Sequence, residues 1–236
     1  MTHKNPIPCT LLMIVLLLAS GCAATKETVT RGKAFPLVYS EQPNSIVVLP
    51  PVNESTFPEA GKYYMANIEK PLLSAGYTMF PPEKVTSILE EKGLHDTESL
   101  YALPMETLRQ YFDADAVLYT RIKQWEESHT GLISRLIISI EAEIVSSKTS
   151  QQLWSYNSGL NVDLNTVKTT GGTMLSLVGS INNDEEKAAT DCMAHALKAN
   201  TKLLRNLPAG PDHEDYLHDQ EVELIGAIPE KYTSQQ

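Results

Sequence analysis

Hydrophobic and polar positions alternate along this chain with the periods of short strands and amphipathic helices. Residues 46–49, Ile-Val-Val-Leu, are wholly apolar and end at Pro50, which predicts a central strand buried on both faces of a sheet. A second short strand is predicted over residues 77–80. Apolar residues three or four positions apart predict three helices: Tyr64, Ile68, Leu72 and Ala75; Val85, Ile88 and Leu89; and Leu108, Tyr111 and Phe112.

Three longer strand patterns follow at residues 116–125, 136–145 and 152–163. In the middle one, Ile138 and Ile140 alternate with mostly polar neighbours, so one face should pack on a core and the other should be largely solvated. Because the connections are short, the three strands should form an antiparallel meander. The predicted fold class is α/β, a single domain with a mixed sheet of about five strands, two short ones plus the meander, packed with helices.

The connection after these strands is apolar on one side. It covers residues 171–183, begins with two glycines and precedes a helix predicted over residues 184–204. Such a short amphipathic segment either covers the domain's own core or docks on another protein or on the membrane interface, and we name it the candidate partner surface. Its apolar residues, at i, i+3, i+4 and i+7, are Met174, Leu177, Val178 and Ile181.

The N-terminal region has the layout of a secretory signal peptide. Lys4 precedes an apolar run over residues 11–18, which is too short to span a bilayer. Residues 19–22, Ala-Ser-Gly-Cys, resemble the lipobox of bacterial lipoproteins, which implies cleavage between Gly21 and Cys22 and acylation of the cysteine. The alternatives are an ordinary signal peptide with a chance cysteine at the cut, or a short buried helix.

These patterns divide the chain into four parts. Residues 1–21 are the lipoprotein signal peptide, and residues 22–45 are a polar, lipidated and flexible tether. Residues 46–207 form the periplasmic α/β domain. Residues 208–236 form an acidic C-terminal tail that we expect to be loosely held.

The net charge limits the partners. Without Lys4, which leaves with the signal peptide, the chain has 18 basic and 29 acidic residues, a net charge of −11. This excess argues against nucleic acid as a partner and against electrostatic attraction to anionic lipid head groups, so acyl chains should make the membrane contact. Cys192 is the one cysteine after Cys22, and an intramolecular disulfide is therefore not expected.

No pattern of residues points to catalysis or metal binding. His213 and His218 are five positions apart, whereas a zinc-binding helix of the zincin type needs two histidines four apart. The chain has no Gly-x-Ser-x-Gly elbow, no phosphate-binding glycine loop and no dinucleotide fingerprint. Glu141 and Glu143 point the same way from one strand, which is usually its solvent face. We therefore predict no enzyme, no catalytic residue, no metal and no cofactor.

Several short sequence runs, spread over most of residues 22–205, have an order and spacing that can be compared with those of known families. They are Leu49-Pro50-Pro51-Val52-Asn53, Pro71-Leu72-Leu73-Ser74-Ala75-Gly76-Tyr77 with Phe80-Pro81, Ala114-Asp115-Ala116-Val117-Leu118, Ile140-Glu141-Ala142-Glu143-Ile144-Val145, and Leu153-Trp154. With the lipobox-like residues they resemble the GNA1162-like family of bacterial lipoproteins. The resemblance implies an α/β fold similar to the N-terminal domain of TolB and the periplasmic part of the curli secretion lipoprotein CsgG, and a place at the outer membrane. It supplies no catalytic residues.

The predicted function is that of a lipoprotein on the periplasmic side of the outer membrane. Its domain would be a non-catalytic binding or assembly component of an envelope complex, with other envelope lipoproteins as partners. A carrier of a small hydrophobic ligand is the alternative, and a hydrolase is third. A binding component predicts a co-purifying protein and a filled core, a carrier predicts a roomy apolar pocket, and an enzyme predicts clustered titratable groups with shifted pKa values in a cleft.

Overall fold

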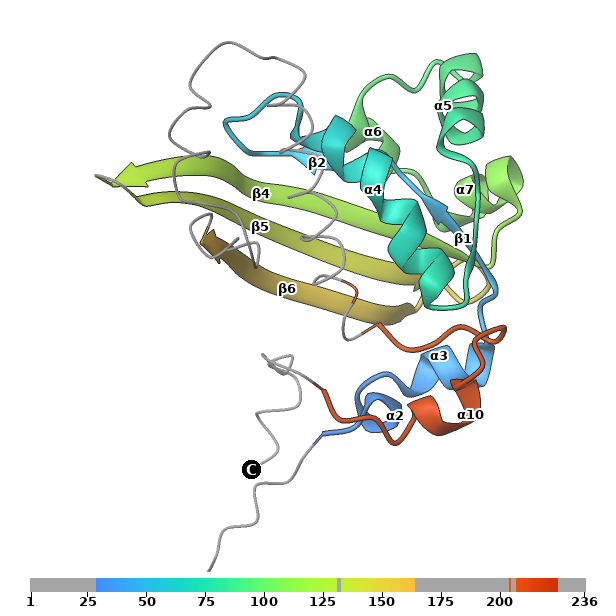
Figure 1. The fold of residues 1–236 in the computed structure, drawn as a ribbon. Helices are drawn as coiled ribbons and strands as arrows, with labels where there is room; N and C mark the ends of the chain where they lie inside the picture. The colour runs from blue at the N-terminus through green and yellow to red at the C-terminus, as the bar shows by residue number, and fades with distance from the viewer. Residues whose placement is uncertain (1–28, 131–132, 164–203, 205–206, 225–236) are drawn as a thin grey trace, which may run out of the picture.

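A mixed six-stranded sheet lies at the centre of the computed structural model, which describes residues 29–130, 133–163, 204 and 207–224. The strand order is β3-β1-β4-β5-β6, and β2 also pairs with β4 (Figure 1). The strands are β1 (Ser45–Val48), β2 (Val52–Asn53), β3 (Thr78–Met79), β4 (Ala116–Thr130), β5 (Ile133–Ser146) and β6 (Gln152–Asp163).

The first strands pair in parallel and the last three form an antiparallel meander. β1 lies between β3 and β4, with Ile46 opposite Met79 on one side and Ala116 on the other. β5 pairs with β4 and with β6 over most of its length. The predicted α/β fold with a mixed sheet and a terminal meander is therefore confirmed.

The sixth strand, β2, is not predicted by the sequence pattern, because two residues are too few to show an alternation. Pro50 and Pro51 interrupt the chain after β1, and β2 then returns to β4, with Val52 opposite Arg121. β1 and β2 therefore lie one after the other along the same side of β4.

One face of the sheet is covered by α4 (Ala60–Ser74). Tyr64, Ile68 and Leu72 of this helix are fully buried in the larger hydrophobic cluster, which confirms the predicted helix face. The same cluster contains alternate residues of β5, among them Ile140, whereas the intervening residues are partly exposed, as the alternation predicts.

The opposite face is covered by α5 (Pro82–Glu91), α6 (Thr97–Tyr101) and α7 (Met105–Phe112). These helices pack on Val47 and Leu49, whereas Ile46 and Val48 face the cluster under α4, so the predicted burial of the first strand on both faces is confirmed. The helix residues buried in this second cluster are Val85, Leu89, Leu100, Leu108 and Phe112.

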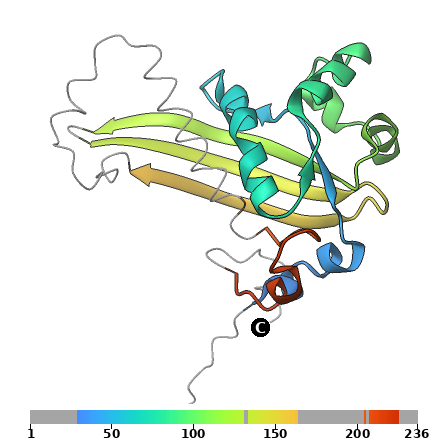
Figure 2. The ribbon, with the colours of Figure 1, turned by 45° about the vertical axis from the view of Figure 1, so that its right-hand side comes forward.

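Three short helices form a cap at one end of the sheet: α2 (Arg31–Ala34), α3 (Pro36–Glu41) and α10 (Tyr216–Asp219) (Figure 1, Figure 2). The predicted flexible tether over residues 22–45 is corrected here, because its second half is folded. Ala34, Phe35 and Val38 are buried in the cluster under α4. Helices of four and six residues are too short to show a hydrophobic period in the sequence.

The predicted loose tail over residues 208–236 is corrected for residues 208–224, and residues 225–236 lie outside the described ranges. Residues 207–224 run back along the beginning of the described chain, where the Arg31 N–H donates to the Val222 carbonyl at 2.8 Å and the Leu224 N–H to the Val29 carbonyl at 2.9 Å. A membrane-spanning helix is not found among the described ranges.

Candidate functional site

The residues that the sequence nominates for lipidation and partner binding lie outside the described ranges, as does nearly all of the predicted last helix. They are Gly21, Cys22, Met174, Leu177, Val178 and Ile181. In the described residues three groups of polar side chains stand out. One lies at the break between β1 and β2, one in the helical cap, and one on the surface of β4 and β5 on the side of α5 to α7, which we name the open face.

Two tyrosines close the break between β1 and β2. Pro50 and Pro51 leave the backbone of Thr120 in β4 without a strand partner on this side, and the hydroxyl of Tyr101 in α6 takes that place. It accepts from the Thr120 N–H at 2.9 Å and donates to the Thr120 carbonyl at 2.8 Å. From the other face, the Tyr64 hydroxyl lies 2.7 Å from the Thr120 hydroxyl. Burial raises the pKa of both tyrosines well above the usual value, so the hydroxyls stay protonated.

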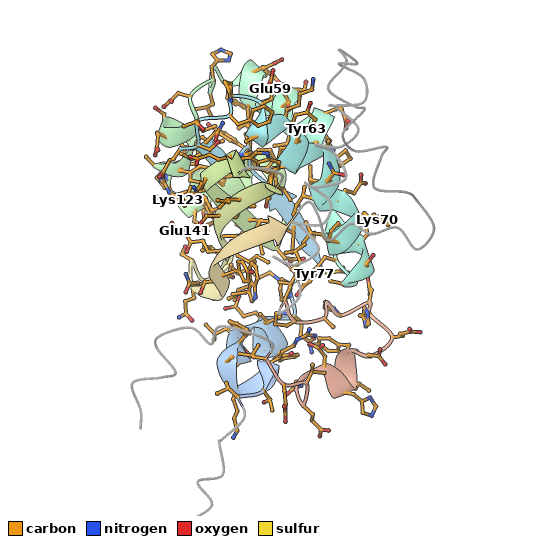
Figure 3. All side chains as sticks on the ribbon, turned by 60° about the vertical axis from the view of Figure 1, so that its left-hand side comes forward. Glu59, Tyr63, Lys70, Tyr77, Lys123 and Glu141 are labelled. Atoms are coloured by element: carbon orange, nitrogen blue, oxygen red, sulfur yellow. The ribbon has the colours of Figure 1, made fainter. Side chains whose placement is uncertain are left out.

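The open face of β4 and β5 carries paired acidic and basic side chains. Arg121 makes a two-point ion pair with Glu98 of α6, at 3.0 and 3.2 Å, and reaches Glu54 at 3.3 Å. Lys123, where the register of β4 shifts, donates a hydrogen bond to Glu54 and lies 3.9 Å from Glu141. Figure 3 shows Lys123 and Glu141 on the side of the sheet away from α4.

Glu141 and Glu143 on this face have different partners. The hydrogen bond from Lys123 holds the pKa of Glu54 below its usual value. Glu143 accepts a hydrogen bond from the side chain of Gln152 at 2.7 Å, whereas Glu141 lies beside Lys123. Glu141 and Glu143 are therefore not arranged as an acid–base pair. Exposed ion pairs of this kind contribute little to stability, and the face suits solvent or a polar partner.

Asp219 of α10 is the centre of the cap and is only 4% exposed. Its carboxylate pairs with Arg31 of α2 and accepts hydrogen bonds from the Tyr39 hydroxyl at 2.6 Å and the Ala209 N–H at 2.7 Å. Burial and the hydrogen bond to Asp219 raise the pKa of Tyr39 far above its usual value. Sequence reasoning missed Asp219 because it lies in an acidic stretch that is typical of a solvated tail.

The cap meets the end of α4 at a close backbone contact. Gly76 has a φ of +82°, and a Cβ at this position would lie 2.6 Å from the backbone nitrogen of His213, so only glycine fits. The Gly210 N–H donates to the Ala75 carbonyl at 2.7 Å. These contacts fix the last turn of α4 against the segment that leads into α10.

A cavity of about 410 Å³ lies between the end of α4 and the cap. Its volume is within the range of small-molecule sites, but its wall mixes apolar surface with charged groups of both signs. The polar part of the wall contains Arg31, Lys70, Ser74, His213 and Asp219, and Pro71 belongs to the apolar part.

Large hydrophobic side chains are exposed at three of the described positions. All three lie in one region, which consists of α2, of α10 with its flanking residues and of the last turn of α4. We name this region the capped end. They are Leu73 on α4 at 52% exposure, Leu217 on α10 at 80%, and Val222 after α10 at 39%.

The described residues contain no group of three His, Cys, Asp or Glu side chains placed to hold a metal ion. His213 and His218 lie on either side of the start of α10, and His213 accepts a hydrogen bond through Nδ1 from the Asp215 N–H at 3.1 Å.

Comparison with known proteins gives a family match over most of the chain. The family model described as "Putative lipoprotein GNA1162-like" matches residues 36–210. The protein named "Putative lipoprotein NMB1124/NMB1162" from Neisseria meningitidis serogroup B is 29% identical over 184 residues, which are 78% of this chain and 83% of the relative.

Two solved structures give the similarity of fold. The crystal structure of lipoprotein GNA1162 from Neisseria meningitidis is 28% identical, with a TM-score of 0.50, and the match covers 65% of this chain and 99% of that one. The PelC dodecamer from Paraburkholderia phytofirmans is 14% identical, with a TM-score of 0.43 over 72% of this chain and 89% of that one, a similarity too low to support any inference about assembly. Since the family model spans the sheet, the helices on both faces and all of α3, the chain belongs to the GNA1162-like family of lipoproteins.

Proposed function

We propose that this protein is anchored through acylated Cys22 to the periplasmic side of the outer membrane, and that its domain is a non-catalytic binding component of an envelope protein complex. The observation that carries the proposal is the place of Cys22. It directly follows three small residues after an apolar run, and it precedes the folded domain of a lipoprotein-family chain by eight residues, counted to Thr30.

The pairing of charged groups supports a non-catalytic role for the domain. On the open sheet face, Glu54, Glu98 and Glu141 are held by Arg121 and Lys123. In the cap, the buried carboxylate is satisfied by a guanidinium, a hydroxyl and an N–H. These charged groups are paired within the fold, whereas catalytic groups usually converge on a cleft that a substrate can enter.

Purification from native membranes in mild detergent tests the binding role. We expect the wild-type protein to migrate on a sizing column as an assembly larger than one chain, with at least one other envelope protein present in constant ratio. The unacylated Cys22→Ser protein is the control for membrane recruitment and should lose this partner or retain less of it. A wild-type protein that runs alone, at the size of one chain, would contradict the proposal.

The carrier function is the second candidate, because the cavity of about 410 Å³ has the size of a ligand site. Its mixed wall suits an amphiphilic anion better than a purely apolar molecule. Native mass spectrometry of the protein from its own membranes tests this function. A retained small molecule that is lost in Ser74→Trp, which fills the cavity, would favour the carrier.

A further inference from the structure

We infer that the capped end of the domain lies against the membrane and that Leu217 is in contact with lipid. The inference rests on the proposed acylation of Cys22, and it adds the orientation of the domain and the surface that the bilayer meets. Three observations carry it: the reach of the chain, the exposed hydrophobic side chains and the local charge.

The chain from the anchor to the fold is short. Thr30, eight residues after Cys22, already bridges to Glu223, and the Arg31 N–H donates to the Val222 carbonyl. Eight residues span at most about 26–29 Å, whatever their conformation. The fifteen residues of β4 alone extend over about 50 Å. An acyl chain on Cys22 therefore holds the capped end near the bilayer, and α5, which lies at the opposite end of the molecule from α2 and α10, is away from it (Figure 1).

The direction in which Leu217 points is fixed by the buried ion pair. Asp219 points into the cap, where it meets Arg31 and Tyr39. Positions two apart on a helix project about 200° from each other, so Leu217 projects outward, in agreement with its exposure of 80%. A single exposed leucine is common, but Leu217 is joined by Val222 and Leu73 at the end that the anchor tethers.

The charges at the capped end indicate the kind of lipid. Asp215, Glu221 and Glu223 are exposed acidic side chains beside α10, whereas Lys33 is the exposed basic side chain of α2. Anionic head groups would be repelled by this excess, and zwitterionic head groups would not. The surface therefore fits a zwitterionic bilayer such as one rich in phosphatidylethanolamine. The acyl anchor supplies the attachment, and the exposed side chains orient the domain on it.

Quenching of a fluorophore by spin-labelled lipid tests the orientation. An environment-sensitive fluorophore is attached to Leu217→Cys or, as the matched control, to Ser87→Cys on the exposed side of α5. Both variants are acylated proteins that also carry Cys192→Ser, reconstituted into vesicles of phosphatidylethanolamine and phosphatidylcholine with nitroxide on the acyl chains. We expect the emission at position 217 to fall at least twofold and the emission at position 87 to stay unchanged. Added phosphatidylglycerol should weaken the quenching at position 217.

The acylation of Cys22 is checked by mass spectrometry in the same samples. A failure of the proposed orientation can then be distinguished from a failure of the proposed function. An acylated protein without quenching at position 217 would overturn the orientation and leave the proposed function intact. This result is expected if the capped end binds a partner protein instead of lipid. Equal quenching at both positions would also overturn it. A membrane-derived protein without an acyl group on Cys22 would overturn the proposed function together with the orientation.

Discussion

Asp115 ties β1 to β4 where both strands begin. Its carboxylate accepts hydrogen bonds from the Asn44 N–H at 3.1 Å and from the N–H and hydroxyl of Ser45 at 3.0 and 2.9 Å, and it pairs with Lys148 at 2.9 Å. The Asp115 N–H donates in return to the Ser45 hydroxyl at 2.9 Å. Partial burial disfavours the charge, but the bonds from Ser45, Lys148 and Asn44 outweigh it and lower the pKa of Asp115 to about 2.

The depressed pKa of Asp115 predicts a loss of stability in acid. Because the pKa is about 2 in the folded chain and near its ordinary value of 3.8 in the unfolded chain, the stabilisation is complete above pH 4 and is lost as the pH falls through 2. We expect urea unfolding of the unacylated Cys22→Ser protein to show Asp115→Asn less stable by about 1–2 kcal/mol at pH 6, after allowance for solvent screening, with most of this difference lost near pH 2.

The control for this effect is Asp113→Asn. Asp113 is exposed and has a φ of +48°, a conformation that asparagine also tolerates. This variant should stay within about 0.5 kcal/mol of the parent at pH 6. A destabilisation by Asp115→Asn of the same size at pH 6 and pH 2 would show that its charge is not the cause.

The hydroxyl of Tyr101 should stabilise the interrupted edge of the sheet. In Tyr101→Phe the N–H and carbonyl of Thr120 lose their partner, and unsatisfied buried backbone groups cost about 1–3 kcal/mol in the free energy of unfolding. Tyr119→Phe is the matched control, since it removes a hydroxyl from the neighbouring ring, which packs edge-on against Tyr101 at 5.0 Å. Equal denaturation midpoints for Tyr101→Phe and Tyr119→Phe would argue against the bridging role.

The three helices of the cap are joined through a single side chain, Asp219. Asp219→Ala removes the partner of Arg31 and Tyr39, and loss of one member of a largely buried pair should cost about 2–4 kcal/mol. The cap should also open locally, so limited proteolysis should cut within residues 31–44. Asp215→Ala, an exposed position that makes no side-chain capping bond, should change neither stability nor cleavage. Resistance of Asp219→Ala to proteolysis would contradict the role of the ion pair.

The candidate partner surface outside the described ranges stays a prediction and is tested by Leu177→Asp. If Leu177 faces a partner, the melting temperature of the unacylated protein should change by only a few degrees while fewer proteins are retained with the anchored form. If Leu177 is part of the core, an unpaired buried carboxylate should unfold the domain. Leu175→Asp is the comparison, because at helical spacing it projects about 160° away from Leu177.

For most elements, length decides whether the sequence predicts them. The exception is β3, which has two residues but lies within the strand predicted over residues 77–80. β4, β5 and β6 have twelve to fifteen residues each and were predictable from their alternation or β-branched content, as was α4 from its four-residue spacing. β2, α2, α3 and α10 have two to six residues and contain less than two full periods.

The capped end was also not predictable from the sequence, but the reason is different. It is held by contacts between segments far apart in the chain, such as the pair of Arg31 and Asp219, which are 188 positions apart. No local pattern encodes such a contact, and the acidic composition of residues 212–223 argued for a solvated tail. The anchor motif, by contrast, is a continuous run that ends at Cys22, and the sequence alone was enough to nominate it.

In the whole molecule, residues 31–44 and 207–224 belong to the folded domain. The connection between Cys22 and this domain is therefore shorter than the predicted tether over residues 22–45. With the proposed anchor at Cys22, the cap would hold the domain close to the membrane. The helices α5 to α7, which lie on the opposite side of the molecule from α2 and α10, would then remain accessible to other proteins of the envelope (Figure 2). The membrane attachment and the orientation of the domain therefore both depend on one covalent modification, the proposed acylation of Cys22.

Labelling with radioactive palmitate in growing cells tests whether Cys22 is acylated. Wild-type protein should take up the label, fractionate with membranes and lack residues 1–21, and Cys22→Ser should take up none. Cys192→Ser, which keeps the proposed anchor, should be labelled like the wild type. Equal labelling of wild type and Cys22→Ser, or a wild-type protein without label, would contradict the account.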